Sequence, residues 1–124
     1  MLESAKTEYL TDIIQQLVVL HGEVECDQFG VLQASEFAFS RARQLLVDSA
    51  SMAKRSDQSI PRGCASTDAQ GGVRIEWVRS RGSVHLIVPA VPDGESYIYH
   101  EVGEEYATQA ATPQALAHWL SEIG

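Results

Sequence analysis

The sequence from Gly71 to Thr108 decides the fold. It reads Gly-Gly-Val-Arg-Ile-Glu-Trp-Val (71–78), Arg-Ser-Arg-Gly (79–82), Ser-Val-His-Leu-Ile-Val (83–88), Pro-Asp-Gly (92–94) and Ser-Tyr-Ile-Tyr-His-Glu-Val (96–102). Apolar and polar residues alternate along the longer segments, and glycine or Pro-Asp-Gly clusters separate them. Alternation with period two, bounded by such clusters, predicts consecutive antiparallel strands joined by turns.

The strands at 73–78 and 83–88 carry their large apolar side chains on one face. The inward-facing residues are expected to be Val73, Ile75, Trp77, Val84, Leu86 and Val88. Polar residues such as Arg74 and His85 occupy the alternate positions. One-sided alternation indicates a sheet with one covered face and one face in water, so the helices of the chain are expected to provide the cover.

The strand at 96–102 leaves two orientations open. Tyr97 and Tyr99 share one face, and Ile98, His100 and Val102 share the other. Either set is apolar enough to point inward. If the second set does, two tyrosines line the face that meets water.

The flanking segments predict three helices. Apolar residues spaced i, i+3, i+4 and i+7 predict an amphipathic helix over 2–20, ended by a His-Gly pair. A second helix is expected over 35–55, where Ser35 is a suitable N-cap. Thr112 and Pro113 predict the start of a third helix, with threonine as N-cap and proline at the first helical position.

Two weaker strands complete the predicted sheet. Small residues at 62–67 predict an edge strand, and 106–110 predicts a short fifth strand. The fold class is therefore α+β, with two N-terminal helices, an antiparallel meander of four or five strands, and a C-terminal helix on the same sheet face. We expect one domain over 1–124, divided into a helical hairpin (1–55), the sheet (60–110) and the last helix (112–123).

Composition places the chain among ordinary globular proteins, with 44% hydrophobic and 21% charged residues. No apolar run reaches the length of a membrane span, and the acidic N-terminus does not fit a secretory leader, so a cytoplasmic protein is expected. In that compartment Cys26 and Cys64 are expected as free thiols, with one disulfide as the alternative. Their spacing fits no metal or redox motif.

The formal charge of −8 is unevenly distributed. Residues 41–81 hold eight bases against four acids, whereas 82–124 hold six acids and no Lys or Arg. An acidic surface repels nucleic acid and anionic membranes, and neither is expected as a partner. The basic middle segment either forms a local patch or neutralises its acidic neighbours.

No sequence motif assigns an activity, a metal or a cofactor. Phosphate-binding glycine loops, nucleophile elbows and Cys-x-x-Cys pairs are all absent from the sequence. We therefore name no catalytic residue and expect no cofactor. The candidates for binding are Arg74, Arg79 and Arg81, whose guanidinium groups suit anions, and His85, Tyr97, Tyr99 and His100 on the strands at 83–88 and 96–102. His85 and His100 would form a pair if both faced water.

The segment Gly71-Gly72-Val73-Arg74-Ile75-Glu76-Trp77, together with Ala-His-Trp-Leu at 117–120, resembles a group of small uncharacterised bacterial proteins. The resemblance covers about residues 60–124. It implies a strand, a turn, a second apolar strand and a closing helix. Genes of that group often sit beside a second small gene, which implies a two-gene, toxin–antitoxin-like or partner-binding arrangement. The resemblance implies no catalytic residue.

Two functional hypotheses follow. The first is a non-enzymatic bacterial protein that acts through protein contacts, with an unidentified partner or as a homodimer through the first helix. The helix residues for such a dimer would be Ile13, Ile14, Leu17 and Val18. The alternative is a small enzyme or ligand-binding protein with a site around His85, His100, Tyr97 and Tyr99. A deep pocket holding two of these side chains would favour it, and a flat face in water would oppose it.

Overall fold

The structure is a computed structural model that describes residues 9–22 and 34–124. Its elements in chain order are α1 (Leu10–Gly22), α2 (Glu36–Arg55), β1 (Cys64–Thr67), β2 (Val73–Arg79), β3 (Gly82–Val88), β4 (Tyr97–Val102), β5 (Glu105–Ala110) and α3 (Pro113–Ile123). The start of the first predicted helix, the connector at 23–33 and Cys26 lie outside the described residues.

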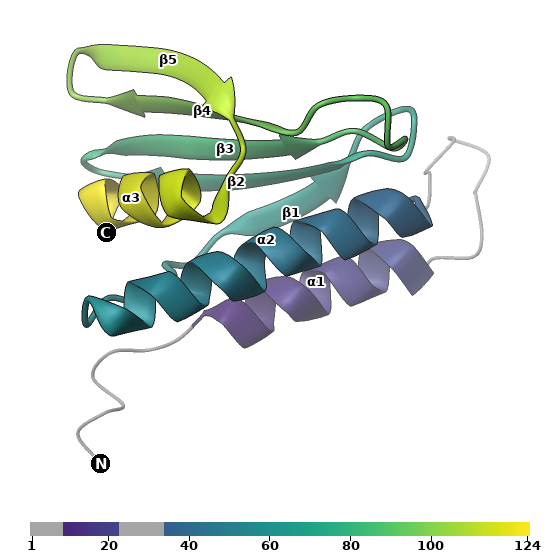
Figure 1. Cartoon of the computed structure of the whole chain (residues 1–124), viewed down its shortest axis with the longest axis horizontal. Coiled ribbons are helices and arrows are strands. Elements are labelled where there is room, and N and C mark those ends of the chain that lie inside the picture. Colours follow the sequence, from purple (N-terminus) through teal and green to yellow (C-terminus); the bar gives the residue numbers. More distant parts are fainter. Residues whose placement is uncertain (1–8, 23–33) are drawn as a thin grey trace.

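The five strands form one antiparallel sheet in the order β1–β2–β3–β4–β5 (Figure 1). Strands that follow each other in the chain are therefore neighbours in the sheet, which confirms the predicted meander. Between β2 and β3, Val73 lies opposite Val88 and Trp77 opposite Val84. This register brings the apolar positions of both strands to one face.

All three helices lie on that face of the sheet (Figure 1). α3 contacts β3 and β4, α2 packs beside α3 and reaches β2 and β3, and α1 packs on α2 and β1. The buried core lies between the helices and the sheet. The α+β class, with the C-terminal helix on the covered face, is as the sequence predicts.

Trp77 anchors the core at the β1 end. It is fully buried, and its indole N–H donates to the carbonyl of Pro61 at 3.0 Å. A Cβ on Gly63 would lie 2.6 Å from the indole nitrogen, so that position admits no side chain without a shift. The segment that leads into β1 is thus packed tightly against the tryptophan ring.

Both helix starts read from the sequence are confirmed. The Ser35 side chain accepts a hydrogen bond from the amide of Ala38, which caps α2. The Thr112 side chain accepts one from the amide of Ala115, with Pro113 in the first turn of α3. Each side chain satisfies an amide that a helix start leaves without an intrahelical partner.

The register of β4 decides the orientation that the sequence leaves open. Ile98 lies opposite Leu86 and His100 opposite Val84, so both point toward the helices and both are buried. Tyr97 and Tyr99 consequently stand on the open face. Only the pairing with β3 selects between the two sets, because each is apolar enough to be buried.

Helix α1 packs with its apolar stripe inward, which corrects the proposed dimer surface. Ile13 and Leu17 are fully buried within the domain, so they are not available for a contact between subunits. Ile14 is partly buried against the same core. Of the four predicted contact residues, only Val18 is substantially exposed, at 51%.

Candidate functional site: the open face of the sheet

The side chains that face away from the helices form the candidate site. Cross-strand pairing aligns Glu76, His85, Tyr99 and Thr108 from β2 to β5. The next row toward the other end of the strands holds Arg74, Ile87, Tyr97 and Ala110. Side chains directly opposite in antiparallel strands contact one another, so these rows make a continuous surface.

Four of the seven predicted site residues meet in a shallow hollow on this face. The hollow has a volume of about 320 Å³ and is lined by Arg74, His85, Ile87, Tyr97, Tyr99 and Thr108. It is open to water along the sheet. Ile87 and Thr108 also line the hollow and were not among the predicted residues, although their strand positions place them on the same face as His85 and Tyr99.

His85 lies at the centre of the polar contacts on β3. Its Nε2 atom is 3.3 Å from the Ser83 hydroxyl, and its Nδ1 atom is 3.9 Å from a carboxylate oxygen of Glu76. Its ring is tilted against that of Tyr99, with centroids 5.6 Å apart. The first distance permits a hydrogen bond, and the second exceeds one.

A serine, a histidine and a carboxylate in this order suggest nucleophilic hydrolysis, but the surroundings do not support it. Hydrolysis needs backbone or side-chain donors aimed at a developing oxyanion. β3 is paired with β2 on one side and β4 on the other, so its backbone amides are engaged in the sheet. The long contact to Glu76 also leaves the His85 ring poorly oriented. The geometry fits binding better than catalysis.

The pKa of the Tyr99 hydroxyl lies above its ordinary value. Desolvation by neighbouring side chains, and then the charge of the neighbouring Glu101, raise it. The hydroxyl also donates to a Glu101 carboxylate oxygen at 3.4 Å. A tyrosine that acts as a base needs the opposite shift, so Tyr99 is suited to donate a hydrogen bond or to present its ring.

His100 does not belong to this face. It points toward the helices, is 5% exposed, and stacks on Trp119 of α3 with ring centroids 3.6 Å apart. The predicted pair of His85 and His100 therefore does not form, because neighbouring pairs along β3 and β4 point to opposite faces of the sheet. The enzyme or ligand-binding site of the second hypothesis therefore keeps only three of its four named residues on one face.

Arg79 and Arg81 lie at the tip of the β2–β3 hairpin, and both are exposed. Arg74 lies farther along β2 and is the one predicted arginine that lines the hollow. The three predicted arginines therefore do not converge on one anion.

The outer edge of the sheet was not among the features predicted from the sequence to have a role. β5 is the last strand of the meander, and all six of its side chains are exposed. It contains neither Lys nor Pro, the residues with which proteins commonly protect a free edge. That composition is readable in the sequence, but the position of the strand at the edge is not.

Within residues 9–22 and 34–124, no three His, Cys, Asp or Glu side chains are grouped so that they could hold a metal ion. Cys64, on β1, is an exposed free thiol. None of the helices in this part of the chain is long and apolar enough to cross a membrane.

No family model matches the chain, and neither the curated proteins nor the solved structures compared with it gave a match. Function is therefore inferred from the geometry of the chain itself.

Proposed function

We propose that this protein is a non-enzymatic binding protein whose β5 edge pairs with an extended, basic segment of a partner protein. The side chains of that segment would lie along the open face of the sheet. The observation that carries the proposal is the free edge of β5 with its six exposed side chains. Addition of a strand to such an edge is an established mode of peptide recognition.

The backbone of β5 offers hydrogen-bonding groups on its outer side. The amide of Ala111 donates to the carbonyl of Ser96 at 3.1 Å, so Ala111 faces β4. In an antiparallel pair, alternate residues direct their backbone groups toward the partner strand and away from it. The amides and carbonyls of Tyr106, Thr108 and Ala110 therefore point outward, where an added strand can pair with them.

The open face supplies apolar and aromatic contacts next to that edge. Tyr106, on β5, is 71% exposed and lies opposite Glu101, and Tyr97, on β4, is 39% exposed and lies opposite Ala110. Val78 is 70% exposed on the same face, but it lies on β2, which β3 and β4 separate from β5. Tyrosine rings supply large contact area at low entropic cost, which makes them frequent anchors in protein interfaces.

The charge of this region favours a basic partner. Residues 82–124 include six acids and no Lys or Arg, and Glu104 and Glu105 stand at the β4–β5 turn. Opposite charge across an interface accelerates encounter and disfavours wrong partners. A second copy of a chain that carries −8, a nucleic acid or an anionic membrane would each bring like charge to the same edge.

The resemblance of residues 60–124 to proteins encoded beside a second small gene supports one choice of partner. The product of the gene next to this one, in an antitoxin-like or other two-gene arrangement in a bacterial cytoplasm, is the partner we propose to test first. A homodimer is the competing assembly. Val18 remains the exposed residue of α1 that such a dimer could use.

The experiment uses a synthetic peptide of alternating Val and Lys, with a Val and Glu peptide as its charge control. Binding should protect the amides of Tyr106, Thr108 and Ala110 from hydrogen exchange. Thr108→Pro should abolish binding because it removes an outward amide, whereas Thr108→Val keeps that amide and should preserve binding. Binding that survives Thr108→Pro, equal affinity for both peptides, or a stable dimer of the free protein would contradict the proposal.

A further inference from the structure

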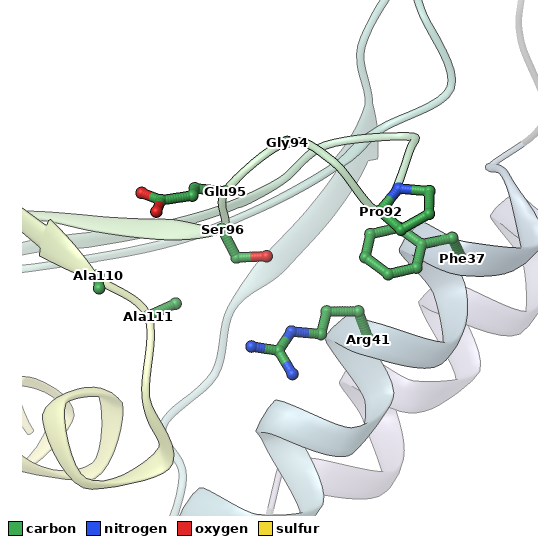
Figure 2. Close-up of a pocket in the computed structure, with 8 residues that line it drawn as sticks. All are labelled: Phe37, Arg41, Pro92, Gly94, Glu95, Ser96, Ala110 and Ala111. Carbon is green, nitrogen blue, oxygen red and sulfur yellow. The ribbon is translucent and has the colours of Figure 1, made fainter.

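A second hollow lies at one end of the sheet, where α2 approaches the β3–β4 loop and the end of β5. It has a volume of about 380 Å³ and is formed by α2, the β3–β4 loop and the link from β5 to α3 (Figure 2). Its lining is Phe37, Arg41, Pro92, Gly94, Glu95, Ser96, Ala110 and Ala111. A volume near the lower end of the range for ligand pockets suits a small molecule or a single terminal residue.

Two polar side chains reach into this hollow without a partner in the described part of the chain. The Arg41 guanidinium extends from α2 toward Ala111, and the Ser96 hydroxyl points back toward α2 (Figure 2). Neither forms a hydrogen bond or an ion pair within residues 9–22 and 34–124. The carboxylate of Glu95 belongs to the same rim but is directed away from Arg41 (Figure 2).

The remaining lining is largely apolar. The Phe37 ring stands beneath the Pro92 ring on one side, and Ala110 and Ala111 form the opposite side (Figure 2). Arg41 and Ser96 lie between these walls. The hollow therefore offers a cation and a hydroxyl at its centre and hydrocarbon at its sides.

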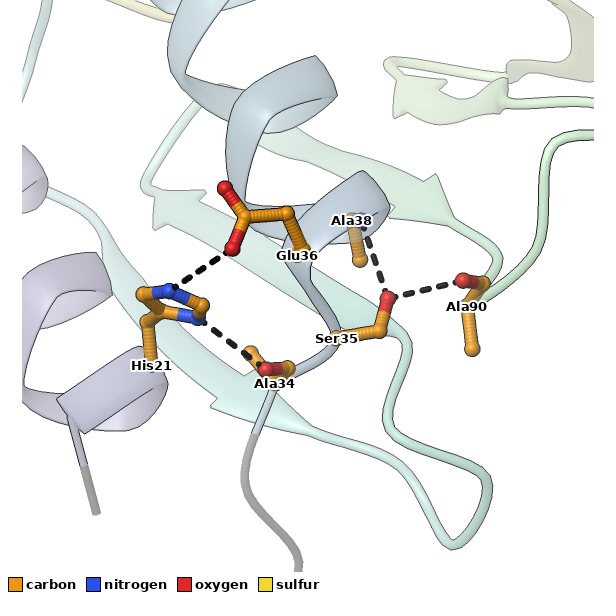
Figure 3. A network of polar contacts seen from close by, with 6 residues as sticks. All are labelled: His21, Ala34, Ser35, Glu36, Ala38 and Ala90. Atoms are coloured by element: carbon orange, nitrogen blue, oxygen red, sulfur yellow. Dashed lines mark hydrogen bonds and ion pairs between the residues drawn. The ribbon is translucent and has the colours of Figure 1, made fainter. Parts of the chain in front are cut away.

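The three walls are tied together, so the hollow is preformed. The Ser35 hydroxyl caps α2 and also donates to the carbonyl of Ala90 at 2.7 Å, which ties the loop to the helix (Figure 3). The amide of Ala111 donates to the carbonyl of Ser96 at 3.1 Å, which ties the loop to the link before α3. A Cβ on Gly94 would lie 2.9 Å from Pro89, so the loop folds closely on itself there.

We propose that this hollow binds a carboxylate attached to a small apolar body. The planar guanidinium of Arg41 would hold the carboxylate by two parallel hydrogen bonds, and the Ser96 hydroxyl would donate a third. The apolar body would rest between Phe37 and the two alanines. In a chain with a formal charge of −8, the exposed guanidinium of Arg41 is the one cation that lines this hollow and is the group there that attracts an anion.

Two sources can supply this chemistry, a free small carboxylic acid or the C-terminal carboxylate of a peptide. The test uses 3-phenylpropionate for the first and the tripeptide Ala-Ala-Phe with a free C-terminus for the second. The corresponding amides, which keep the shape and lose the charge, serve as controls. Amide chemical shifts of Ser96 and Ala111 report on the site in solution.

Binding to the preferred probe should have a Kd of about 1 mM or tighter and should shift the Ser96 and Ala111 signals. Arg41→Gln should weaken it about tenfold or more, since a charge-assisted pair is lost. Arg43→Gln removes the same charge from the same helix outside the hollow and should leave the affinity unchanged. Glu95→Gln should strengthen binding modestly by removing a nearby negative charge.

Equal binding of acid and amide, equal loss with Arg41→Gln and Arg43→Gln, or no shift at Ser96 and Ala111 with either acid would overturn the proposal. Thr108→Pro, which tests the β5 edge, alters no residue of this hollow. Ala110 belongs to both regions, but Arg41→Gln leaves β5 unaltered and Thr108→Pro leaves Arg41 and Ser96 unaltered, so the two variants distinguish failure of one proposal from failure of the other.

Discussion

The imidazole of His100 is buried between β4 and α3, and its Nδ1 atom has no hydrogen-bond partner among the described residues. The ring stacks almost parallel to that of Trp119, at an angle of 13°. The indole N–H of Trp119 is itself satisfied by the Gln109 side chain at 2.9 Å. The His100 ring therefore stabilises the fold by stacking on Trp119, whereas burial of its unpaired Nδ1 atom destabilises it.

Replacing His100 with phenylalanine should increase the free energy of unfolding by about 1 kcal/mol. Phenylalanine keeps a flat ring against Trp119 and removes the unpaired polar atom. Chemical denaturation of both proteins measures the difference. A loss of stability in the variant would mean that Nδ1 has a partner in solution that compensates its burial.

Replacing Glu101 with glutamine should lower the pKa of Tyr99 toward its ordinary value. The carboxylate is a cause of the upward shift, although partial desolvation is the larger one. Because the raised pKa lets the folded state hold the proton longer, stability should fall as pH rises between the ordinary and the raised pKa. Glu101→Gln should narrow the pH range over which stability falls. NMR titration of ring-labelled tyrosine follows Tyr99 separately, and an unchanged pKa in the variant would refute this assignment.

The N-terminus of α2 contacts three other parts of the chain (Figure 3). Ser35 caps the helix and bonds the loop at Ala90, and its amide donates to the carbonyl of Gly71 at 2.9 Å. On the other side, the His21 ring lies 3.5 Å from a Glu36 carboxylate oxygen and stacks on Phe39. The start of α2 therefore joins α1, the turn before β2 and the β3–β4 loop.

Replacing Ser35 with alanine should cost about 2 kcal/mol, roughly twice the cost of Thr112→Ala at the start of α3. Both substitutions remove a cap, but Ser35→Ala also leaves the Ala90 carbonyl without its donor. Parallel denaturation curves measure the two losses. Equal losses would show that the bond to Ala90 contributes nothing to stability.

For the whole molecule, the position of each helix determines which apolar surface is left for a partner. Leu17 is fully buried, whereas Val18 and Val19 on the same helix are 51% and 62% exposed. The covered sheet face is occupied by this chain's own helices. Among the described residues, the exposed surfaces include the open sheet face, the β5 edge, the hollow beside α2 and the short exposed segment of α1.

Leu17→Ala should therefore destabilise the fold by about 2–5 kcal/mol, while Val18→Ala should change it by less than about 0.5 kcal/mol. Thermal unfolding measures both. Light scattering of the Val18→Ala protein should give the same mass as the unchanged chain. A lower mass for the variant would instead place a subunit contact at this helix.

The features that the sequence predicted correctly depend on residues close to one another in the chain. The alternation of Val73, Ile75 and Trp77 reported directly on a strand with one buried face. Ser35 and Thr112-Pro113 marked helix starts correctly, because a cap is a contact among residues close in sequence. These signals sufficed for the fold class, the meander and the covered face.

The candidate sites depended on contacts between distant segments. The sequence allowed His100 beside His85, and only the register of β4 on β3 separated them onto opposite faces. It likewise contained Arg41 and Ser96, but nothing local relates residues that are far apart in the chain. The pairing of strands and the packing of helices decide on which face, edge or pocket a side chain lies. The sequence alone therefore identified the strands and helices, whereas the tertiary structure decided where both proposed binding surfaces lie.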